Sequence, residues 1–396
     1  MSHDQSPTPA QRFTRYGSYE LEQNLQSACE RVANEIREIV PLVSLDGLLL
    51  AGGFGSGEGG VLATPEGQRA FGEFEFVLLA REGTEPAVQA LAVRLEALGE
   101  RMALWTGAVG TFRITTRQQI ADSETSPFLH ELARGHRVLI GPESLSASWT
   151  RHQEPSAISL QEVTHLLFQR CSGLLCAARR LQRAEFTSED ADAVHRQLSR
   201  LELALGDVVL AAHGEYRGSS VERHQRLATF TPAEPVPNLS LIYEMHAWGL
   251  SYKLRPTRGV GGRENLQRRL TTLATVARDL WLWLEGRRLG QKFRTAACYA
   301  DSAINKCPGT SRWESALLSC RLLGLPALFT GKLAHPRQRL FHALALLLWE
   351  PALFNTPRLR AHLARELHHP VRTFAEAAEA YTALRRQCDA ANPAAH

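Results

Sequence analysis

The sequence has 396 residues but lacks a hydrophobic run long enough to cross a membrane. Its most apolar stretch, residues 344–354, is shorter and more interrupted than the ~20 apolar residues that a membrane-spanning helix needs. Residues 1–12 are polar and contain proline, so they also lack the apolar core of a secretory signal. These absences predict a soluble cytoplasmic protein with no membrane partner.

Cysteine pairs at zinc-binding or redox spacing are missing as well. The seven cysteines include no C-x-x-C, and the two nearest in sequence are Cys171 and Cys176. We therefore expect reduced, mostly buried thiols. The sequence also has no internal repeat of fixed period and no long biased tract, which argues against a repeat protein or a low-complexity chain.

The composition is that of a globular protein. Hydrophobic residues make up 44% of the chain and charged residues 22%. A chain of 396 residues exceeds one compact core, so two or three domains are expected. The net charge of +4 is too small to indicate a nucleic-acid-binding protein by itself.

Strand and helix patterns alternate through the first 150 residues. After a predicted flexible tail, residues 1–17, apolar positions three and four apart predict a helix over 18–40. Strands are expected at 45–51, 73–79, 107–116 and 138–140, and helices at 86–104 and from 128 onward. Such alternation is typical of an α/β domain, which we place at residues 18–150, with a mixed sheet flanked by helices.

The rest of the chain carries only helical patterns. They cover residues 159–183, 189–213, 265–286, 312–323, 337–349 and 371–388. Pro232, Pro235 and Pro237 interrupt them, so we expect a helical bundle over 151–235 and a further helical region over 236–396. The expected fold class is α+β, with an N-terminal α/β domain followed by an all-α domain.

A dense glycine stretch, residues 52–60, follows the first predicted strand. Glycines in such a turn let backbone amides approach phosphate without side-chain obstruction. Gly55, Gly57 and Gly60 fit the dinucleotide-binding spacing G-x-G-x-x-G, and Glu75 lies twenty residues beyond the first of them. The segment that follows, VLATPEGQ, does not open a helix, so a dinucleotide-binding fold is not favoured.

Two glutamates lie on the strand predicted after the glycines. Side chains alternate along a strand, so Glu73 and Glu75 share one face, about 6.8 Å apart, whereas Phe74 and Phe76 face the opposite side and are buried. Two carboxylates beside a phosphate-binding loop are an arrangement that holds Mg²⁺ against a nucleoside triphosphate. The alternative is that both glutamates are solvated residues on the outer face of an edge strand.

The glycine stretch and this strand together resemble those of polymerase-beta superfamily nucleotidyltransferases. The runs LLLAGGFGSGEGGV and FGEFEFVLLA are similar to the GGFGRGEG loop and the N-D-Y-D-F strand of bacterial members. Glu73 and Glu75 fall where the family has its two metal-binding aspartates. The resemblance implies nucleotide binding by the residues of the loop, which are Gly52, Gly53, Ser56, Gly57 and Glu58.

The similarity extends into the helical region. Segments 166–175 and 203–227 resemble helical segments of the family, with Gly206, Asp207, Tyr216 and Arg223 at matching positions. A glycine inside a helix, such as Gly206, commonly marks the close approach of another helix or of a neighbouring domain. The resemblance implies metal-dependent transfer of a nucleotidyl group from a nucleoside triphosphate to a hydroxyl acceptor, with Mg²⁺ as the cofactor.

The sequence departs from the family pattern at the metal site. Ser56 replaces an arginine, and both metal-binding aspartates are glutamates. The family's third carboxylate, the base for the attacking hydroxyl, has no counterpart, and Arg113 lies on its strand. A cation there opposes Mg²⁺ binding and favours phosphate, unless Arg113 is merely a solvent-facing strand residue. A second hypothesis is therefore a non-catalytic relative that binds a nucleotide or a protein partner through the same site.

Two further groups of charged residues occur in the helical region. Residues 253–294 contain eleven Lys and Arg against three acids. Such an excess suits a phosphorylated or nucleic-acid partner, but a solvated helix face paired with acids elsewhere is the preferred interpretation. His362, His368 and His369 lie near a predicted helix end, where a cation complements the helix dipole without any metal.

Overall fold

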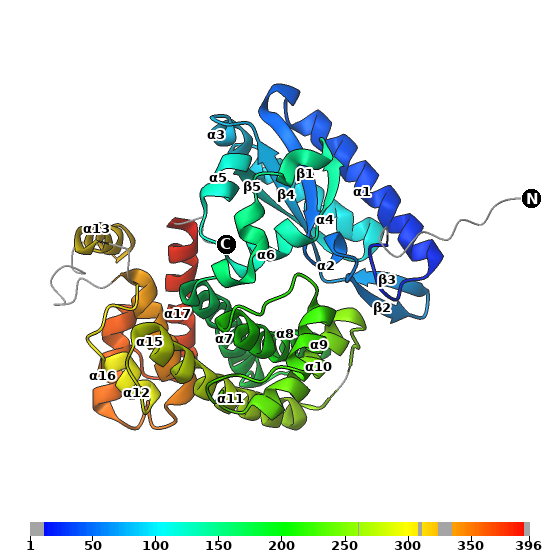
Figure 1. The fold of residues 1–396 in the computed structure, drawn as a ribbon. Coiled ribbons are helices and arrows are strands. Elements are labelled where there is room, and N and C mark those ends of the chain that lie inside the picture. Colours follow the sequence, from blue (N-terminus) through cyan, green and yellow to red (C-terminus); the bar gives the residue numbers. More distant parts are fainter. Residues whose placement is uncertain (1–11, 260, 308–310, 324–334, 392–396) are drawn as a thin grey trace, which may run out of the picture. The chain divides into compact units, whose positions relative to one another are not determined.

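The computed structural model describes residues 12–259, 261–307, 311–323 and 335–391 (Figure 1). The chain is mixed α+β, as the sequence predicts, and forms two compact units. The first unit comprises Met1–Val163, Glu202–Ala233 and Tyr243–Arg258, and the second comprises Thr164–Leu201, Glu234–Ile242 and Gly259–His396. Each unit is thus formed by three separate segments of the chain. The domains expected from the sequence instead follow one another along the chain.

The main sheet belongs to the first unit. Its strands are β1 (Leu45–Ala51), β4 (Glu73–Ala80), β5 (Val109–Thr116) and β6 (Arg137–Ile140), in the order β5-β4-β1-β6. β4 runs antiparallel to β1 and parallel to β5. Ala51 pairs with Glu75, and Glu75 pairs with Thr111. The end of β1 therefore lies beside the beginnings of β4 and β5, at the point where the chain enters the glycine stretch.

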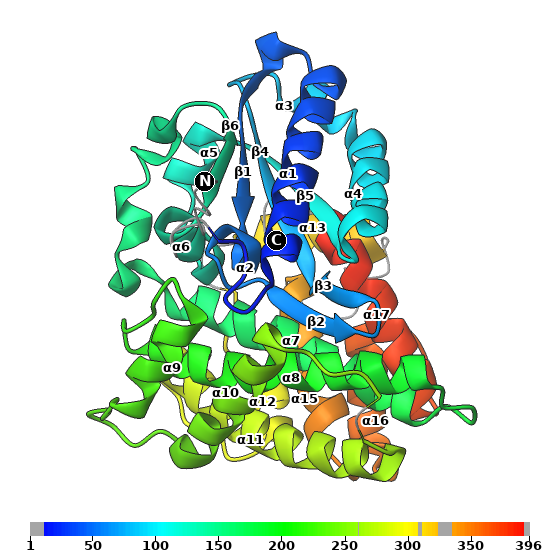
Figure 2. The same cartoon turned by 90° about the vertical axis from the view of Figure 1, so that its right-hand side faces the viewer.

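Helices cover both faces of this sheet (Figure 1 and Figure 2). α1 (Tyr19–Ile39) and α4 (Ala92–Thr106) pack on one face, where their apolar residues meet Phe74 and Phe76 in a buried core. α5 (Arg117–Asp122) and α6 (Pro127–Arg134) cover the other face, where they pack on Val77 and Leu79. Alternate residues of β4 thus enter two different cores, as the period of a strand requires.

Polar caps begin the helices that flank the sheet. The side chain of Ser18 accepts a hydrogen bond of 3.2 Å from the Leu21 amide at the start of α1. Thr116 and Gln119 form a reciprocal capping box at the start of α5. Such caps satisfy amides that have no partner inside the helix, so they locate each helix start from local sequence.

The segment between the glycine stretch and β4 folds as a hairpin. β2 (Gly60–Thr64) and β3 (Gly67–Phe71) pair antiparallel, and Gly67 at the turn has a φ of 124°, which favours glycine. Residues 60–71, all of them described, contain no helix, in agreement with the argument against a dinucleotide-binding fold. The helix predicted at 86–104 is interrupted and forms α3 (Glu85–Gln89) and α4.

The predicted flexible tail, residues 1–17, is wrong for its last six residues. Phe13 and Thr14 are buried, and their backbone amides donate to the carboxylate of Glu22 on α1 at 2.7 and 3.0 Å. This segment is ordered because a buried glutamate of the next helix accepts hydrogen bonds from its backbone amides. Residues 1–11 lie outside the described residues.

The remaining elements are helical, as predicted for the chain after residue 155. All six predicted helices occur, as α7 (Leu160–Leu181), α8 (Ser188–Ala212), α11 (Arg263–Leu289), α13 (Arg312–Leu323), α15 (Pro336–Trp349) and α17 (Phe374–Ala391). Among the described residues after 155, four further α-helices occur, namely α9 (Ser220–Ala228), α10 (Leu239–Leu254), α12 (Ala296–Asp301) and α16 (Pro357–Leu367). The predicted proline break separates α9 from α10.

The apolar helix α15 forms part of the core of the second unit. Its buried residues include Leu340, Phe341 and Leu344, and they occur on all sides of the helix. Among the described residues, no helix combines the length and the apolar character that a membrane span requires. The seven cysteines all lie in the described part of the chain as free thiols, and four of them are buried.

Candidate functional site

The glycine stretch forms a tight turn directly after β1. Gly52–Gly55 make a single helical turn, α2, in which the Ser56 amide donates to the Gly52 carbonyl at 3.0 Å. The Glu58 amide then donates to the Gly53 carbonyl at 2.7 Å. Gly52 and Gly57 have φ angles of 62° and 80°, in the region that favours glycine. The backbone path of the turn thus depends on glycine at these two positions.

The carboxylate of Glu75 lies against this turn. A Cβ atom added to Gly52 would be only 2.6 Å from Oε1 of Glu75, so a side chain at this position would displace the carboxylate. The shared face of Glu73 and Glu75 is confirmed, because Phe74 and Phe76 on the opposite face are buried. Glu73 is exposed and Glu75 is partly exposed, so ligands in solvent can reach both carboxylates.

The alternative interpretation of an edge strand is wrong. β4 lies between β5 and β1 inside the sheet; it pairs with β5 from Glu73 onward and with β1 from Glu75 onward. The two glutamates therefore lie at the beginning of an interior strand, and Glu75 pairs with Ala51, the last residue before the turn. The sequence pattern alone could not show this, because strand order depends on long-range pairing.

Arg113 lies on the same face of the sheet as the two glutamates. It pairs with Val77, which lies two residues after Glu75 and on the same face of β4. Its guanidinium lies 4.1 Å from the centre of the Phe128 ring. Burial lowers the pKa of Arg113, and the negative charge of Glu75 offsets part of this shift. Arg113 is therefore partly buried beside a carboxylate, so the interpretation as a solvent-facing residue is wrong.

Ser56 ends the turn. Its hydroxyl donates to the Gly53 carbonyl at 3.2 Å, and the residue is exposed. A short hydroxyl at this position stays close to its own backbone. Ser56 therefore supplies no charge beside the turn, and Arg113 is a cation on the sheet face that carries Glu75.

Glu58 is buried and binds the chain itself. Its carboxylate accepts hydrogen bonds from the Ser219 hydroxyl, the Ser220 amide at 2.8 Å and the Val221 amide at 3.2 Å, at the start of α9. The Lys253 ammonium lies 3.5 Å away. Burial alone would raise the pKa of Glu58, but Lys253 and the three donors lower it. Glu58 therefore joins the end of the glycine turn to α9.

A buried network of charges continues from α9. Arg223 donates to Oδ1 of Asp207 at 2.7 Å, to the Ser220 hydroxyl at 2.9 Å, and lies 3.1 Å from Oε1 of Glu131. The Tyr216 hydroxyl also donates to Glu131. Asp207, Tyr216 and Arg223, which lie apart in the sequence, are thus brought together in one buried network.

His246 on α10 completes this network. Its Nε2 lies 3.2 Å from Oδ1 of Asp207. Burial alone would raise the pKa of Asp207, but Arg223 and His246 lower it to about 2. A Cβ at Gly206 would be 2.4 Å from the His246 ring, so the predicted close approach of another helix at this glycine is confirmed. His246 itself was not identified from the sequence, since a lone histidine in an apolar helix carries no motif.

Several cations of the basic stretch 253–294 have partners within the chain. Arg263 donates to the Leu181 carbonyl at 2.9 Å, and Arg288 donates to the buried carboxylate of Glu285 at 2.6 Å. Trp281 is buried, whereas Trp248 is 54% exposed. These contacts account for part of the stretch, and the choice between a phosphorylated or nucleic-acid partner and a solvated helix face stays a prediction.

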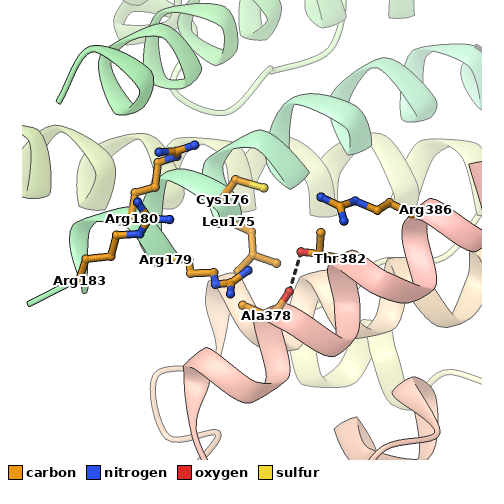
Figure 3. A pocket seen from close by; sticks show the side chains of 8 residues that line it. All are labelled: Leu175, Cys176, Arg179, Arg180, Arg183, Ala378, Thr382 and Arg386. Carbon is orange, nitrogen blue, oxygen red and sulfur yellow. Dashed lines mark hydrogen bonds between the residues drawn. The ribbon is translucent and has the colours of Figure 1, made fainter. Parts of the chain in front are cut away.

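The second unit contains a cavity of about 280 Å³ beside α7 and α17 (Figure 3). Its lining consists of Leu175, Cys176, Arg179, Arg180, Arg183, Ala378, Thr382 and Arg386. Arg180 and Arg183 donate to Asp190 at 2.7 and 2.8 Å, and Arg179 lies 3.7 Å from Glu379. Three of the four guanidinium groups thus have acidic partners in the chain, so the charge of the lining does not by itself indicate an anionic ligand.

Comparison with known proteins supplies no further assignment. No protein-family model, curated protein or solved structure matches this chain. The candidate site is therefore defined by its own geometry, namely the glycine turn, the two glutamates and Arg113.

Proposed function

We propose that the first unit is a nucleotidyltransferase-type domain that binds a nucleoside triphosphate with Mg²⁺ and transfers its nucleotidyl group to a hydroxyl acceptor. One observation carries the proposal. The carboxylate of Glu75 lies so close to Gly52 that a Cβ there would be 2.6 Å from Oε1. A phosphate-binding type of turn and a pair of accessible carboxylates are thus adjacent, which is the arrangement that metal-dependent phosphoryl chemistry uses.

The donor groups of the site fit Mg²⁺. This ion prefers oxygen ligands and is commonly held by one or two carboxylates together with water and substrate phosphates. Glu73 and Glu75 supply two carboxylates on one sheet face, and the absence of a side chain at Gly52 leaves room beside Glu75. When bound, the ion would neutralise the developing negative charge on the phosphates.

The other residues of the site support this chemistry from the chain. Gly52, Gly53 and Gly57 leave the backbone of the turn accessible to phosphate oxygens. Glu58 fixes the end of the turn by its bonds to α9. Arg113 adds a cation on the face of the glutamates and can bind phosphate oxygens through its planar guanidinium.

A second candidate function is non-catalytic binding of a nucleotide or a partner through the same site. Arg113 is the observation that favours it. Residues 109–116 of β5 contain no carboxylate that could act as the base for the attacking hydroxyl. Instead, the guanidinium of Arg113 carries a positive charge on that strand, where it opposes a metal and attracts phosphate. Binding without Mg²⁺ is what this candidate requires.

The first experiment measures binding of fluorescent ATP and GTP to the purified full-length chain, with and without Mg²⁺. The variants are Glu73→Ala/Glu75→Ala and Arg113→Met, and Glu96→Ala on the exposed face of α4 is the matched control. The first function requires Mg²⁺-dependent binding that the double variant abolishes and the control retains. Mg²⁺-independent binding that only Arg113→Met abolishes supports the second candidate. A folded chain that binds neither nucleotide overturns the first function and the nucleotide-binding form of the second.

Transfer itself needs a separate measurement. The chain is incubated with α-labelled nucleoside triphosphate and fractionated cell extract, and labelled products and released pyrophosphate are measured. The first function predicts both signals, and the Glu73→Ala/Glu75→Ala variant should lose them. Mg²⁺-dependent binding without any label transfer or pyrophosphate release would instead favour the second candidate.

A further inference from the structure

Three side chains in the second unit lie close enough together to bind one metal ion. They are His342 on α15 and His362 and Glu366 on α16, and their ligand atoms lie within 4.8 Å of one another. The three residues are only 1%, 3% and 6% exposed. His362 and Glu366 are one helical turn apart, so they share a helix face. The sequence interpretation of His362 as a residue that only complements a helix end is therefore wrong.

Asp301, at the end of α12, orients the ring of His362. Its Oδ1 lies 2.9 Å from Nδ1 of His362, whereas Nε2 of the same ring lies 3.0 Å from Oε1 of Glu366. A histidine that donates its Nδ1 proton to a carboxylate keeps a lone pair on Nε2, and this arrangement is usual for metal-bound histidines. With that tautomer, a lone pair of His362 faces a carboxylate oxygen, so a cation or a proton must lie between them.

His342 faces the same oxygen of Glu366. Its Nδ1 lies 3.3 Å from Oε1, and its Nε2 has no hydrogen-bond partner among the described residues. With a lone pair on Nδ1, this buried contact also needs a cation or a proton between the ring and the carboxylate oxygen.

The distances and charges fit a divalent ion. Ligand atoms 2.0–2.2 Å from a tetrahedral centre are about 3.4 Å from one another, close to the 3.0 and 3.3 Å that separate the two histidine nitrogens from Glu366. The charge of Asp301 is already paired with Arg358 at 3.3 Å, whereas Glu366 is a buried negative charge that a cation beside the two imidazoles would balance.

Two cations of the chain are near this cluster but are directed elsewhere. The Lys306 ammonium donates to the Ser302 carbonyl at 3.2 Å and lies 4.8 Å from the centre of the Tyr299 ring. Arg339 donates to the Arg365 carbonyl at 3.2 Å. Both groups thus bind backbone carbonyls, and neither is placed between the histidines and Glu366 by these contacts.

We propose that His342, His362 and Glu366 bind a Zn²⁺ ion that joins α15 to α16, with Asp301 of α12 as the positioning residue for His362. Two imidazoles and one carboxylate are a ligand set that zinc accepts, with one further position for water. All three ligands are buried, so the ion would lie in the core of the second unit. This site is independent of the proposed nucleotide chemistry in the first unit.

The test uses the full chain without any affinity tag that contains histidine. The protein is stripped with EDTA, titrated with Zn²⁺ and examined by metal analysis and thermal unfolding. We expect one zinc per chain and a rise in the unfolding midpoint on zinc addition. His362→Gln and Glu366→Gln should lose the bound zinc, whereas the exposed control His369→Gln should retain it. Equal zinc content in the ligand variants and the control would overturn the proposal.

A second measurement uses the wild-type chain, so it tests the site even if the ligand variants do not fold. Cobalt titrated into the stripped wild-type chain should give visible absorption bands of a protein-bound ion, and zinc should displace them. Asp301→Asn should keep the site but weaken zinc affinity by about 10–100-fold, as expected for loss of a positioning carboxylate. A folded wild-type chain that shows neither cobalt bands nor a zinc-dependent midpoint means that a proton, not a metal, lies between His362 and Glu366.

Discussion

The carboxylates of the two candidate sites differ in their exposure to solvent. In the first unit Glu73 is exposed and Glu75 partly exposed, beside a turn of glycines. In the second unit Glu366 is 6% exposed and lies between two buried histidines. An exposed carboxylate is stable in water without a ligand, whereas a buried one requires a cation, a proton or hydrogen-bond donors at all times. The first arrangement suits a ligand that exchanges, and the second suits one that stays.

Glu58 shows that the same contrast exists within the glycine turn. It lies six residues from Gly52 in sequence, but its carboxylate is buried and receives its donors from α9 and Lys253. Glu75 instead remains partly open to solvent beside Gly52. Glu58 therefore stabilises the turn, whereas Glu75 can contact a ligand. The predictions below test this difference.

The largest effect is expected from Arg223→Ala. It leaves Asp207 buried without its main cationic partner, which should cost about 3–5 kcal/mol of unfolding free energy. Urea unfolding followed by circular dichroism measures the loss. Arg226→Ala, a partly exposed arginine on the same helix paired with Glu215, should cost at most about 1 kcal/mol. Equal losses in the two variants would contradict the importance of burial.

Zinc removal comes next. Zinc at 100 times its dissociation constant should stabilise the chain by about 2.7 kcal/mol if the ion binds only the folded state. A zinc-selective chelator added with excess Mg²⁺ should lower the unfolding midpoint and leave nucleotide affinity unchanged. Loss of nucleotide binding under these conditions would show that the two ions do not act at separate sites.

Glu58→Gln should cost about 1–3 kcal/mol at neutral pH, because it removes a buried charge-assisted acceptor. The folded-state pKa of Glu58 is lowered, so its contribution to stability is present above the unfolded-state pKa of about 4.3 and is lost as pH falls through the lower folded value. The difference between wild type and variant should therefore shrink below that pH. A pH-independent difference in urea unfolding would show that the charge of Glu58 does not matter.

The smallest effect on stability is expected from Gly52→Ala. Its positive φ should cost about 1 kcal/mol, the same as for Gly83→Ala, which has a φ of 79° and nothing near a new Cβ. Only Gly52→Ala displaces Glu75, so only this variant should lose Mg²⁺-dependent nucleotide binding. Nucleotide binding that survives in Gly52→Ala, or that is lost in both variants, would contradict a role for the contact between Gly52 and Glu75.

Local signals account for the elements that the sequence predicts. The periodicity before residue 40 and the cap Ser18 define α1, and alternation defines β4 with Phe74 and Phe76 inside. The hairpin β2–β3 and helix α16 were not predicted; the two strands have five residues each and the helix has eleven. The same holds for the tail residues, since Phe13 is buried by a contact with α1 that no local pattern reveals.

The candidate sites depend on the sequence to different degrees. The glycine turn and the paired glutamates follow from local order and from the alternation of a strand, and these are physical consequences of backbone geometry. Tertiary structure decided that β4 is an interior strand, that Glu58 is buried under α9, and that Arg113 is beside Glu75. It also brought Asp301 and His342 to the pair of His362 and Glu366, which the spacing of one helical turn already places on one face of α16. Pairing of strands and packing of helices act between distant residues, so no local pattern could specify them.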